Sequence, residues 1–587
     1  MNARRARGER REHVSAAKHS PEAEHSSGPD EKPCDARFFA AQGAVSGCEG
    51  KCGNRHVSPA SDARFFAAQG AVSGFEGKCG NRHVSPICCI LRGHEFRNEV
   101  QVVAQIFFPG AKFHFQEFAE NRAKNSAEAS QSSDAPCDSR ACSRYCIESF
   151  FEGEFEGEYR ACAIIYKNGA EIAREIFEGR PEAWLNSRRV LMLAVYHALQ
   201  KAVGAYTPWG ALTGIRPSKL VREWLCDCND AEVLARLADP FCVSDEKARL
   251  ALEVAHAERR TEQRIRGTIG LYVSVPFCPS RCVYCSFNTA HKVAGNSVLE
   301  AYVSAMTDEM KSSRIKGVYD ARKISSIYIG GGTPTFLPEN LLERMLYAVC
   351  ENFSEFFTAD AEFTVEAGRP DTLTSAKLKI LRKYGVNRIA VNPQTLNDNT
   401  LAAIGRGHTA ADFFRAFALA RDVGFECINT DLIVGLPGET VDDMRRTTDA
   451  VVKLLPENIT IHTLAIKRAS LLTANAREDE KLDEKLNEKL GEKLIEEALS
   501  VAAEACSAAG LSPYYLYRQK NMVGLFENVG YSLPGRECLY NVGMMAEVQT
   551  ISGIGAGAVS KYVSGDKIRR EFNAKEPAVY IARQCLG

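Results

Sequence analysis

The sequence predicts an α/β protein whose main part is a partial barrel of six parallel strands, a (β/α)6 arrangement. After Gly270, six apolar runs of strand length are separated by amphipathic stretches of helical length, the pattern of parallel strands joined by crossover helices. Before Gly270 the order of elements is mixed, which predicts a smaller α+β domain. The N-terminal segment follows neither pattern and carries an internal duplication.

Residues 1–98 are expected to be a duplicated segment that is disordered or is not part of the native protein. Residues 35–59 recur as residues 62–86, with Cys48 replaced by Phe75. Repeats that stack into a solenoid usually diverge and number three or more. The cysteines and histidines of the two copies lack the second cysteine pair that a zinc-ligand spacing requires. We therefore expect no site residue in this segment.

Residues 99–266 are expected to form an N-terminal α+β domain that ends in a helical connector. Val102–Phe108 and Tyr159–Tyr166 read as strands. Pro181–Ala205 and Asp230–Arg266 have helical periodicity.

Residues 267–470 are expected to form the partial barrel, and residues 471–587 a C-terminal region on the substrate side. The predicted strands are Leu271–Phe277, Ser325–Gly330, Glu362–Ala367, Arg388–Pro393, Cys427–Gly435 and Ile459–Ile466. The predicted helices are Ser297–Ile315, Glu339–Phe353, Leu373–Tyr384, Thr409–Val423 and Thr440–Leu455. In folds of this kind the chemistry lies at the carboxyl ends of the strands. A four-residue repeat over residues 480–495 predicts a helix with one leucine stripe, and a solvated outer helix is favoured over a partner-binding one.

Composition excludes several classes of protein. The chain has 587 residues, of which 73 are Lys or Arg and 74 are Asp or Glu, so the formal net charge is −1. This balance argues against nucleic-acid and membrane binding, which need a cationic excess. No apolar run is long enough to cross a bilayer, and no apolar segment follows the basic N-terminus as in a secretory signal. We expect a cytoplasmic protein, in whose reducing surroundings the 21 cysteines indicate thiolate chemistry or metal ligation rather than disulfides.

Three cysteines follow the first predicted barrel strand at a spacing typical of metal ligation. Cys278, Cys282 and Cys285 are separated by three and then two residues. Soft thiolates select iron–sulfur clusters or zinc. Structural zinc normally has a fourth Cys or His close by, and the nearest histidine, His291, stands in a different context. A [4Fe–4S] cluster with one uncommitted iron is favoured, with zinc and three inert thiols as the alternatives.

The Cys-x3-Cys-x2-Cys motif, with an aromatic residue before its last cysteine, resembles that of the radical S-adenosylmethionine (radical SAM) enzymes. The resemblance implies that the three cysteines hold three irons of a [4Fe–4S] cluster while SAM chelates the fourth, and that SAM is cleaved to a 5′-deoxyadenosyl radical. On the same resemblance the residues that contact SAM are Tyr272, Tyr284, Gly331, Gly332, Thr333, Glu366, Gln394, Arg406 and Asp431, with no catalytic residue assigned.

Most of these residues stand at or near the ends of predicted strands. Glycines in Gly330–Thr335 let backbone amides approach a ligand closely. Glu366, Gln394 and Asp431 belong to the third, fourth and fifth strands, and Arg406 can pair with the SAM carboxylate. A helix cap or a surface ion pair is the alternative for each residue alone, and convergence on one barrel mouth disfavours it.

A narrower resemblance, over residues 270–561, is to the oxygen-independent coproporphyrinogen III oxidase family. It rests on YIGGGTPT, GVNRIAVNPQTLND and INTDLIVGLPGET, while PWGALTGIRPSKL and ITIHTLAIKRAS resemble its HemZ, or coproporphyrinogen dehydrogenase, branch. The resemblance implies oxidative decarboxylation of two propionates of coproporphyrinogen III to vinyls in anaerobic haem biosynthesis, giving protoporphyrinogen IX, with an electron donor of the flavodoxin or ferredoxin type. The cations that we expect to bind the substrate carboxylates are Lys467, Arg518, Lys520 and Arg536.

Two positions depart from the family pattern. Phe287 stands where well-studied oxidases carry a further cysteine, and Ser274 stands where many relatives carry a histidine. Haem chaperones of the same fold also lack that cysteine. A haem-binding chaperone with a radical SAM fold, and a radical SAM enzyme with another substrate, are therefore the alternatives to an oxidase.

Overall fold

A computed structural model describes residues 87–118, 143–155, 157–182, 184–204, 207–285, 287, 290, 295–315, 322–465, 491–519, 526–565 and 567–585. The chain divides into two compact units, Met1–Asn81 and Arg82–Gly587, and every described residue belongs to the second. The expectations for the duplicated copies, for most of the four-residue repeat, and for Lys467 and Lys520 lie outside the described residues.

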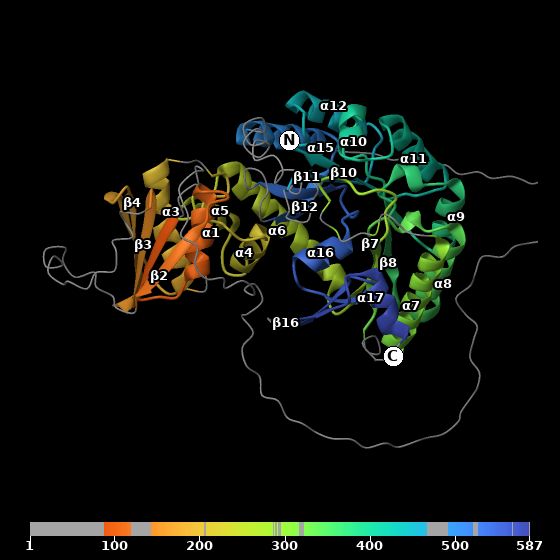
Figure 1. Cartoon of the computed structure of the whole chain (residues 1–587), viewed down its shortest axis with the longest axis horizontal. Coiled ribbons are helices and arrows are strands. Elements are labelled where there is room, and N and C mark those ends of the chain that lie inside the picture. The colour runs from red at the N-terminus through yellow and green to blue at the C-terminus, as the bar shows by residue number, and fades with distance from the viewer. Residues whose placement is uncertain are drawn as a thin grey trace, which may run out of the picture. The chain divides into compact units, whose positions relative to one another are not determined.

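A five-stranded sheet with the order β2–β1–β3–β4–β5 forms the first part of the described chain (Figure 1). Its strands are β1 (Ile87–Arg92), β2 (Phe113–Phe118), β3 (Tyr145–Phe155), β4 (Glu158–Lys167) and β5 (Ala170–Gly179). β1 runs parallel to β2 and β3, whereas β4 is antiparallel to both of its neighbours. Helices α1 (Arg97–Phe107) and α3 (Ser187–Val203) pack into the apolar core of this sheet.

Two expectations for this part are wrong, while the strand predicted at Tyr159–Tyr166 is confirmed as β4. Val102–Phe108 belongs to helix α1 rather than to a strand, because Val100, Val103, Ala104 and Phe107 recur with helical period and are the buried residues. The folded part also begins before residue 99, since β1 lies inside the segment expected to be disordered and is buried over most of its length.

Three helices connect the two sheets: α4 (Pro217–Trp224), α5 (Asp230–Ala238) and α6 (Asp245–Ile265). The helical stretch predicted from Asp230 is thus two helices, because Asn229 and Ser244 each cap a separate helix start with their side chains.

Lys247 of α6 forms an ion pair of 2.8 Å with Glu527, and both side chains are 2% exposed.

The second sheet contains the six predicted parallel strands, which are confirmed. They are β6 (Ile269–Val275), β7 (Ile324–Gly331), β8 (Phe357–Glu366), β9 (Arg388–Ala390), β10 (Ile428–Val434) and β11 (Asn458–Thr463). The helices between them are α7 (Asn296–Ile315), α8 (Glu339–Phe353), α9 (Ser375–Lys383), α10 (Asp398–Ala403), α11 (Ala410–Asp422) and α12 (Val441–Val452), with short 3-10 turns η1 (Pro334–Phe336), η2 (Ser354–Phe356) and η3 (Pro370–Thr372).

The C-terminal region extends both edges of this sheet, so that the described part of it has eleven strands. At one edge, β13 (Glu527–Ser532) pairs antiparallel with β11, and β12 (Ser512–Arg518) pairs antiparallel with β13. At the other edge, β14 (Thr550–Ile554) pairs parallel with β6. Strands β15 (Val559–Ser564) and β16 (Lys567–Phe572) extend that edge in antiparallel pairs. The helices of this region are α15 (Glu492–Ala508), α16 (Leu539–Met545) and α17 (Pro577–Cys585).

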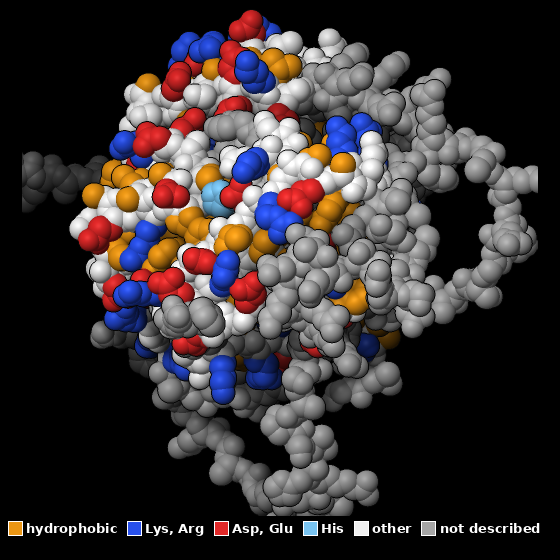
Figure 2. Space-filling view, turned by 90° about the vertical axis from the view of Figure 1, so that its left-hand side faces the viewer, with side chains coloured by type: hydrophobic (Ala, Val, Ile, Leu, Met, Phe, Trp, Pro, Cys, Tyr) orange, Lys and Arg blue, Asp and Glu red, His pale blue; other side chains and the backbone are white. Residues whose placement is uncertain are grey.

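The described surface carries charges of both signs. Figure 2 shows Lys and Arg side chains interspersed with Asp and Glu on the face that it presents, with apolar side chains between them. No helix in the described ranges is both long enough and apolar enough to cross a bilayer.

Candidate active site

The carboxyl ends of β6 to β11 lie at one edge of the sheet, because the six strands are parallel and adjacent. The candidate site is the set of loops that leave these ends. The cysteine loop leaves β6, the glycine loop leaves β7, and the polar residues of the remaining strands follow in order.

The cysteine loop is held to its neighbours by hydrogen bonds. The amide of Val283 donates to the carbonyl of Ile404 at 3.0 Å, and the Ser280 hydroxyl donates to the carbonyl of Gly405 at 2.9 Å. The Cys278 sulfur lies 3.5 Å from the Thr333 hydroxyl. The loop therefore has a fixed position between the glycine loop after β7 and the turn that holds Arg406.

Arg369 was not among the predicted site residues, although it lies beside the cysteines. Its guanidinium is buried, forms a two-pronged pair with Asp371 at 3.0 Å for each bond, and points an Nη1 atom at the Cys282 sulfur from 3.9 Å. A buried guanidinium at this place offsets negative charge on sulfur. Arg369 stands in the segment EFTVEAGRPD, residues 362–371, where its only sequence signal is an Arg–x–Asp motif shortly after the end of a predicted strand.

The three thiols lie close enough for their charges to act on one another. Burial raises the pKa of the Cys278 thiol, and Cys285 and Cys282 add to this effect, while Thr333 and Arg369 act against it. Three neighbouring, partly buried thiolates without a metal would repel one another and lose solvation, and a bound metal cation would stabilise them.

Close packing, and not only the approach of a ligand, requires glycine residues in the loop at the end of β7. A Cβ at Gly332 would lie 2.5 Å from the Phe277 carbonyl oxygen, and one at Gly330 would lie 2.8 Å from the Glu366 carboxylate. Gly331 has φ +109° and donates its amide hydrogen to Glu366 at 3.1 Å. The Gly332 and Thr333 amides donate to the carbonyls of Val275 and Phe277, each at 2.8 Å, which fastens this loop to the start of the cysteine loop.

Glu366 ends β8 and is a buried carboxyl group. It accepts a hydrogen bond of 2.6 Å from the Tyr328 hydroxyl in addition to that from Gly331. Burial raises the pKa of Glu366 to about 7, and the nearby Asp431 adds to this, while the bonds from Tyr328 and Gly331 oppose it. The carboxyl group is therefore near its titration point at neutral pH.

Tyr328 also belongs to an aromatic stack inside the barrel. Its ring lies 4.4 Å from that of Tyr540 and 6.3 Å from that of Tyr272, with nearly parallel planes. Tyr272 in β6 is thus separated from Glu366 in β8 by one intervening strand, β7. Tyr284 lies on the cysteine loop, packed against the apolar cluster that contains Ile404.

Gln394 and Arg406 carry buried polar atoms without protein partners. Gln394 has the left-handed φ of +70°, which is strained for a residue with a side chain, and its Oε1 is buried without a hydrogen bond. Arg406 donates to the carbonyl of Gly368 at 3.0 Å and also to that of Asn392, whereas its Nε has no hydrogen-bond partner. An acceptor and a cation are thus left available for a ligand that carries an ammonium and a carboxylate.

Asp431 in β10 is fixed by two amide side chains and faces a histidine that the sequence reasoning missed. Asn429 and Asn392 each donate to one of its oxygens at 2.7 Å, and His462 Nε2 lies 3.7 Å from Oδ2. On the other side of the imidazole, His462 Nδ1 lies 3.4 Å from the Tyr517 hydroxyl. The sequence signal for His462 was its place in the middle of the sixth predicted strand, whereas the observed strand β11 ends one residue after it.

A cavity of about 190 Å³ opens at this end of the barrel. Its lining combines the cysteine loop, the ends of β10 and β11, and the C-terminal strands β12 and β13. The lining residues are Tyr284, Cys285, Phe287, Gln394, Ile433, His462, Thr463, Leu464, Ala465, Tyr517, Gln519 and Asn528. The structure therefore brings three of the predicted site residues, Tyr284, Cys285 and Gln394, to one cavity together with His462 and Tyr517.

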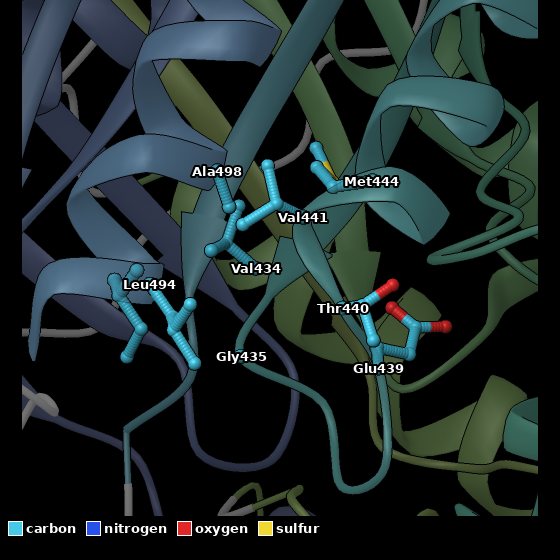
Figure 3. A pocket seen from close by; sticks show the side chains of 9 residues that line it. Val434, Gly435, Glu439, Thr440, Val441, Met444, Leu494 and Ala498 are labelled. Carbon is cyan, nitrogen blue, oxygen red and sulfur yellow. The ribbon is translucent and has the colours of Figure 1, made fainter. Parts of the chain in front are cut away.

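A smaller hollow lies beside the end of β10, between α12 and α15. Figure 3 shows Val434, Val441 and Ala498 converging on it from these elements. Its volume is about 20 Å³, room for about one water molecule, and its walls are mostly apolar. It is not a candidate for the site.

Two of the four expected substrate cations lie among the described residues, and neither reaches the cavity. Arg518 is 7% exposed, stacks over Trp209 at 5.5 Å and donates to the carbonyl of Leu212, so it ties β12 to an earlier segment. Arg536 follows β13 and lies near the amino end of the barrel, where its carbonyl accepts bonds from Arg388 and Asn458. Their expected contact with substrate carboxylates therefore gains no support from this cavity and stays a prediction.

The two departures from the family pattern have different surroundings. Phe287 is 64% exposed at the cavity wall. Ser274 is buried and donates its hydroxyl hydrogen to the Ala556 carbonyl at 2.7 Å, which fixes the turn between β14 and β15 to the end of β6.

The residues present fit a [4Fe–4S] cluster with SAM better than a single metal ion. Each thiolate of a cubane binds a different iron, so three cysteines and one open iron match the donors that the cysteine loop offers, whereas structural zinc is normally four-coordinate. The orphaned atoms of Gln394 and Arg406 match the ammonium and the carboxylate of SAM.

A partial barrel of parallel strands whose first strand leads into a loop of three cysteines defines a radical SAM protein. A family model described as the radical SAM superfamily accordingly matches residues 272–451.

Comparison with known proteins indicates which family of radical SAM proteins this chain resembles. The oxygen-independent coproporphyrinogen-III oxidase-like protein HemZ of Bacillus subtilis is 37% identical over 410 residues, which cover 68% of this chain and 80% of that protein. The heme chaperone HemW of Mycobacterium tuberculosis is 30% identical over 312 residues, covering 53% of this chain and 73% of that protein. Among solved structures, the coproporphyrinogen III oxidase HemN of Escherichia coli matches with 22% identity and a TM-score of 0.44, covering 56% of this chain and 71% of that one.

The chain belongs to the radical SAM superfamily and, within it, to the family that contains HemZ and HemW. Its cofactors are those of the superfamily, a [4Fe–4S] cluster and SAM.

Proposed function

We propose that the protein converts propionate side chains of coproporphyrinogen III to vinyls by oxidative decarboxylation, giving protoporphyrinogen IX. The observation that carries this proposal is the extent of the similarity to the coproporphyrinogen-III oxidase-like protein HemZ, which covers 80% of that protein and reaches well beyond the radical SAM region. An electron donor of the flavodoxin or ferredoxin type would supply the electron that cleavage of SAM consumes.

The chain's own residues hold and orient the reacting groups. When bound, the cluster and SAM supply a carbon radical that removes a hydrogen atom from the propionate β-carbon. Cys278, Cys282 and Cys285 hold the cluster, and the buried Arg369 offsets its negative charge. Gln394 and Arg406 offer the acceptor and the cation for the amino-acid part of SAM. Exclusion of water and orientation are the protein's contribution to such chemistry.

The cavity is too small for a whole tetrapyrrole. Sites that enclose a drug-sized ligand have volumes of roughly 300–1,000 Å³, and this cavity has about 190 Å³. We propose that one pyrrole with its propionate enters it, between Tyr284 and Tyr517, and that the rest of the macrocycle lies at the rim beside the exposed ring of Phe287.

A haem-binding chaperone is the second candidate function. It is favoured by the similarity to the heme chaperone HemW over 73% of that protein, and by the phenylalanine at position 287. Haem delivery predicts stoichiometric haem binding without any vinyl product.

Anaerobic incubation of reconstituted protein with SAM, reductant and coproporphyrinogen III tests the proposal, with 5′-deoxyadenosine and porphyrin products measured together. We expect deoxyadenosine to form along with protoporphyrinogen IX. Tight haem binding without product would favour the chaperone, and SAM cleavage without tetrapyrrole turnover would favour another substrate.

A further inference from the structure

The described lining of the cavity is poor in fixed positive charge. Among the described residues no Lys or Arg lines it, and His462 contributes an imidazole. The other polar side chains of the wall are amides, hydroxyls and the Cys285 thiol. A site built only to hold a carboxylate would normally present Arg or Lys.

The chemistry of CO2 loss favours a neutral hydrogen-bond donor beside the reacting carboxylate. Once the β-hydrogen has been removed, the bond between the α-carbon and the carboxylate breaks. One electron of that bond pairs with the unpaired electron to form the vinyl double bond, and the other passes to a one-electron acceptor of the flavin or iron–sulfur class. The carboxylate thereby loses its negative charge as it becomes CO2. A fixed cation would stabilise the charged reactant more than the transition state, and so would slow this step.

The Tyr517 hydroxyl is a donor of a more suitable kind, and His462 lies beside it. The Tyr517 hydroxyl lies 3.4 Å from His462 Nδ1, and both side chains line the cavity. His462 Nε2 faces Asp431 at 3.7 Å, which fixes the orientation of the imidazole and leaves the Nδ1 side turned toward Tyr517. The His462 side chain remains 26% exposed, so a ligand can reach it.

We propose that the Tyr517 hydroxyl binds the carboxylate of the propionate that is decarboxylated, that His462 holds this hydroxyl in place, and that Asp431 positions His462. This inference rests on the proposed function and names the part of the chain that recognises the reacting side chain of the substrate. Neither Tyr517 nor His462 gives up or takes a proton in the step, since Tyr517 holds the carboxylate only by a hydrogen bond.

The test compares Tyr517→Phe and His462→Gln with the control Tyr515→Phe. Tyr515 lies on the same strand and stacks on Tyr517 at 6.1 Å, but its hydroxyl does not line the cavity. Two fluorescent porphyrins serve as probes of binding. Coproporphyrin III carries all four propionates, and protoporphyrin IX lacks the two that react.

We expect each test variant to bind coproporphyrin III about tenfold more weakly, the size of a lost hydrogen bond to a charged group. Binding of protoporphyrin IX should change by less than twofold, and the ratio of deoxyadenosine to vinyl product should rise. The control should behave as the wild type does.

Equal weakening for both porphyrins would assign the two residues a merely structural role and overturn the inference. Unchanged binding of coproporphyrin III by the variants would also overturn the inference. If the wild type still makes vinyl product in that case, the proposed function stands. A wild type that neither binds coproporphyrin III nor makes vinyl product would overturn the proposed function, and the inference with it.

Discussion

At the scale of single residues, the buried sulfur of Cys282 is the thiol that Arg369 faces directly, at 3.9 Å. We predict that Cys282→Ala prevents assembly of a normal cluster, because one of its three protein ligands is lost. Iron and sulfide content after anaerobic reconstitution, with SAM cleavage, measure this. Cys226→Ala is the control, since that cysteine is exposed and distant in sequence from the loop. Wild-type iron content and SAM cleavage in Cys282→Ala would contradict the assignment.

Gly332 is predicted to be irreplaceable for steric reasons. A Cβ in Gly332→Ala would approach the backbone of Phe277 to 2.5 Å, so the start of the cysteine loop must shift. We expect a loss of about 1–3 kcal/mol in the free energy of unfolding and lower cluster loading. Urea denaturation measures the former, with Gly214→Ala as a control because its Cβ would meet nothing closer than 4.0 Å. Equal stability of the two variants would show that the loop tolerates the side chain.

The buried Glu366 predicts a pH dependence of stability. Its pKa is near 4.5 in the unfolded chain and about 7 in the folded protein, so the folded state holds the proton more tightly. Glu366 therefore contributes roughly 3 kcal/mol to the free energy of unfolding below pH 4.5, and this contribution is lost as the pH rises to about 7. Glu366→Gln should flatten the curve of unfolding free energy of the cofactor-free protein over this range, whereas the exposed Glu504→Gln should not. A parallel curve for Glu366→Gln would contradict the raised pKa.

Sequence reasoning reached the residues that stand in recognisable motifs, and it missed those whose role depends on contacts distant in sequence. Gln394 could be found from its place after a strand. Its left-handed backbone could not, because a pattern of residue types does not show strain. His462 and Tyr517 meet across 55 residues of chain. Arg518 was assigned to the substrate because its burial against Trp209, more than 300 positions earlier in sequence, cannot be seen in the local sequence.

At the scale of elements, the buried pair of Lys247 and Glu527 joins α6 to β13, and Trp209 donates to the same carboxylate at 2.7 Å. Lys247→Met leaves this carboxylate buried without its cation, and we predict a loss of about 3–5 kcal/mol. Lys201→Met is the matched control, because its pair with Glu175 is largely exposed and should contribute less than about 1 kcal/mol. Thermal and urea unfolding of both variants measure the difference, and similar losses would argue against a special role for the buried pair.

Strand β1 determines where the chain can be shortened. Deletion of Met1–Asn81 removes only the first compact unit, and we expect activity to remain because the candidate site residues all lie after position 270. Deletion of residues 1–92 also removes β1, which lies between β2 and β3 in the sheet, and should destabilise the fold. Circular dichroism and turnover of both truncated forms measure this. A stable and active form that lacks β1 would contradict its place in the core.

The elements themselves were predicted where period and length agree. The barrel strands have long apolar runs, and their predicted limits differ from the observed ones by only a few residues. Helix α1 was missed because its apolar residues, read from Val102, look continuous, and the helical spacing becomes clear only when Val100 is included. The strands that β12 to β16 add to both sheet edges depend on long-range pairing, which local patterns do not reveal.

At the scale of the whole molecule, the parallel barrel places the thiols, the polar strand ends and the C-terminal strands around one cavity. That arrangement supports a single chemical claim: that a hydrogen atom passes from a substrate propionate to the adenosyl carbon derived from SAM.

Coproporphyrinogen III deuterated at the propionate β-carbons tests this claim most directly, in an anaerobic reaction followed by mass spectrometry. The account predicts 5′-deoxyadenosine that carries deuterium in proportion to the vinyl groups formed. Vinyl product accompanied by unlabelled deoxyadenosine, or labelled substrate recovered without any vinyl product, would contradict it.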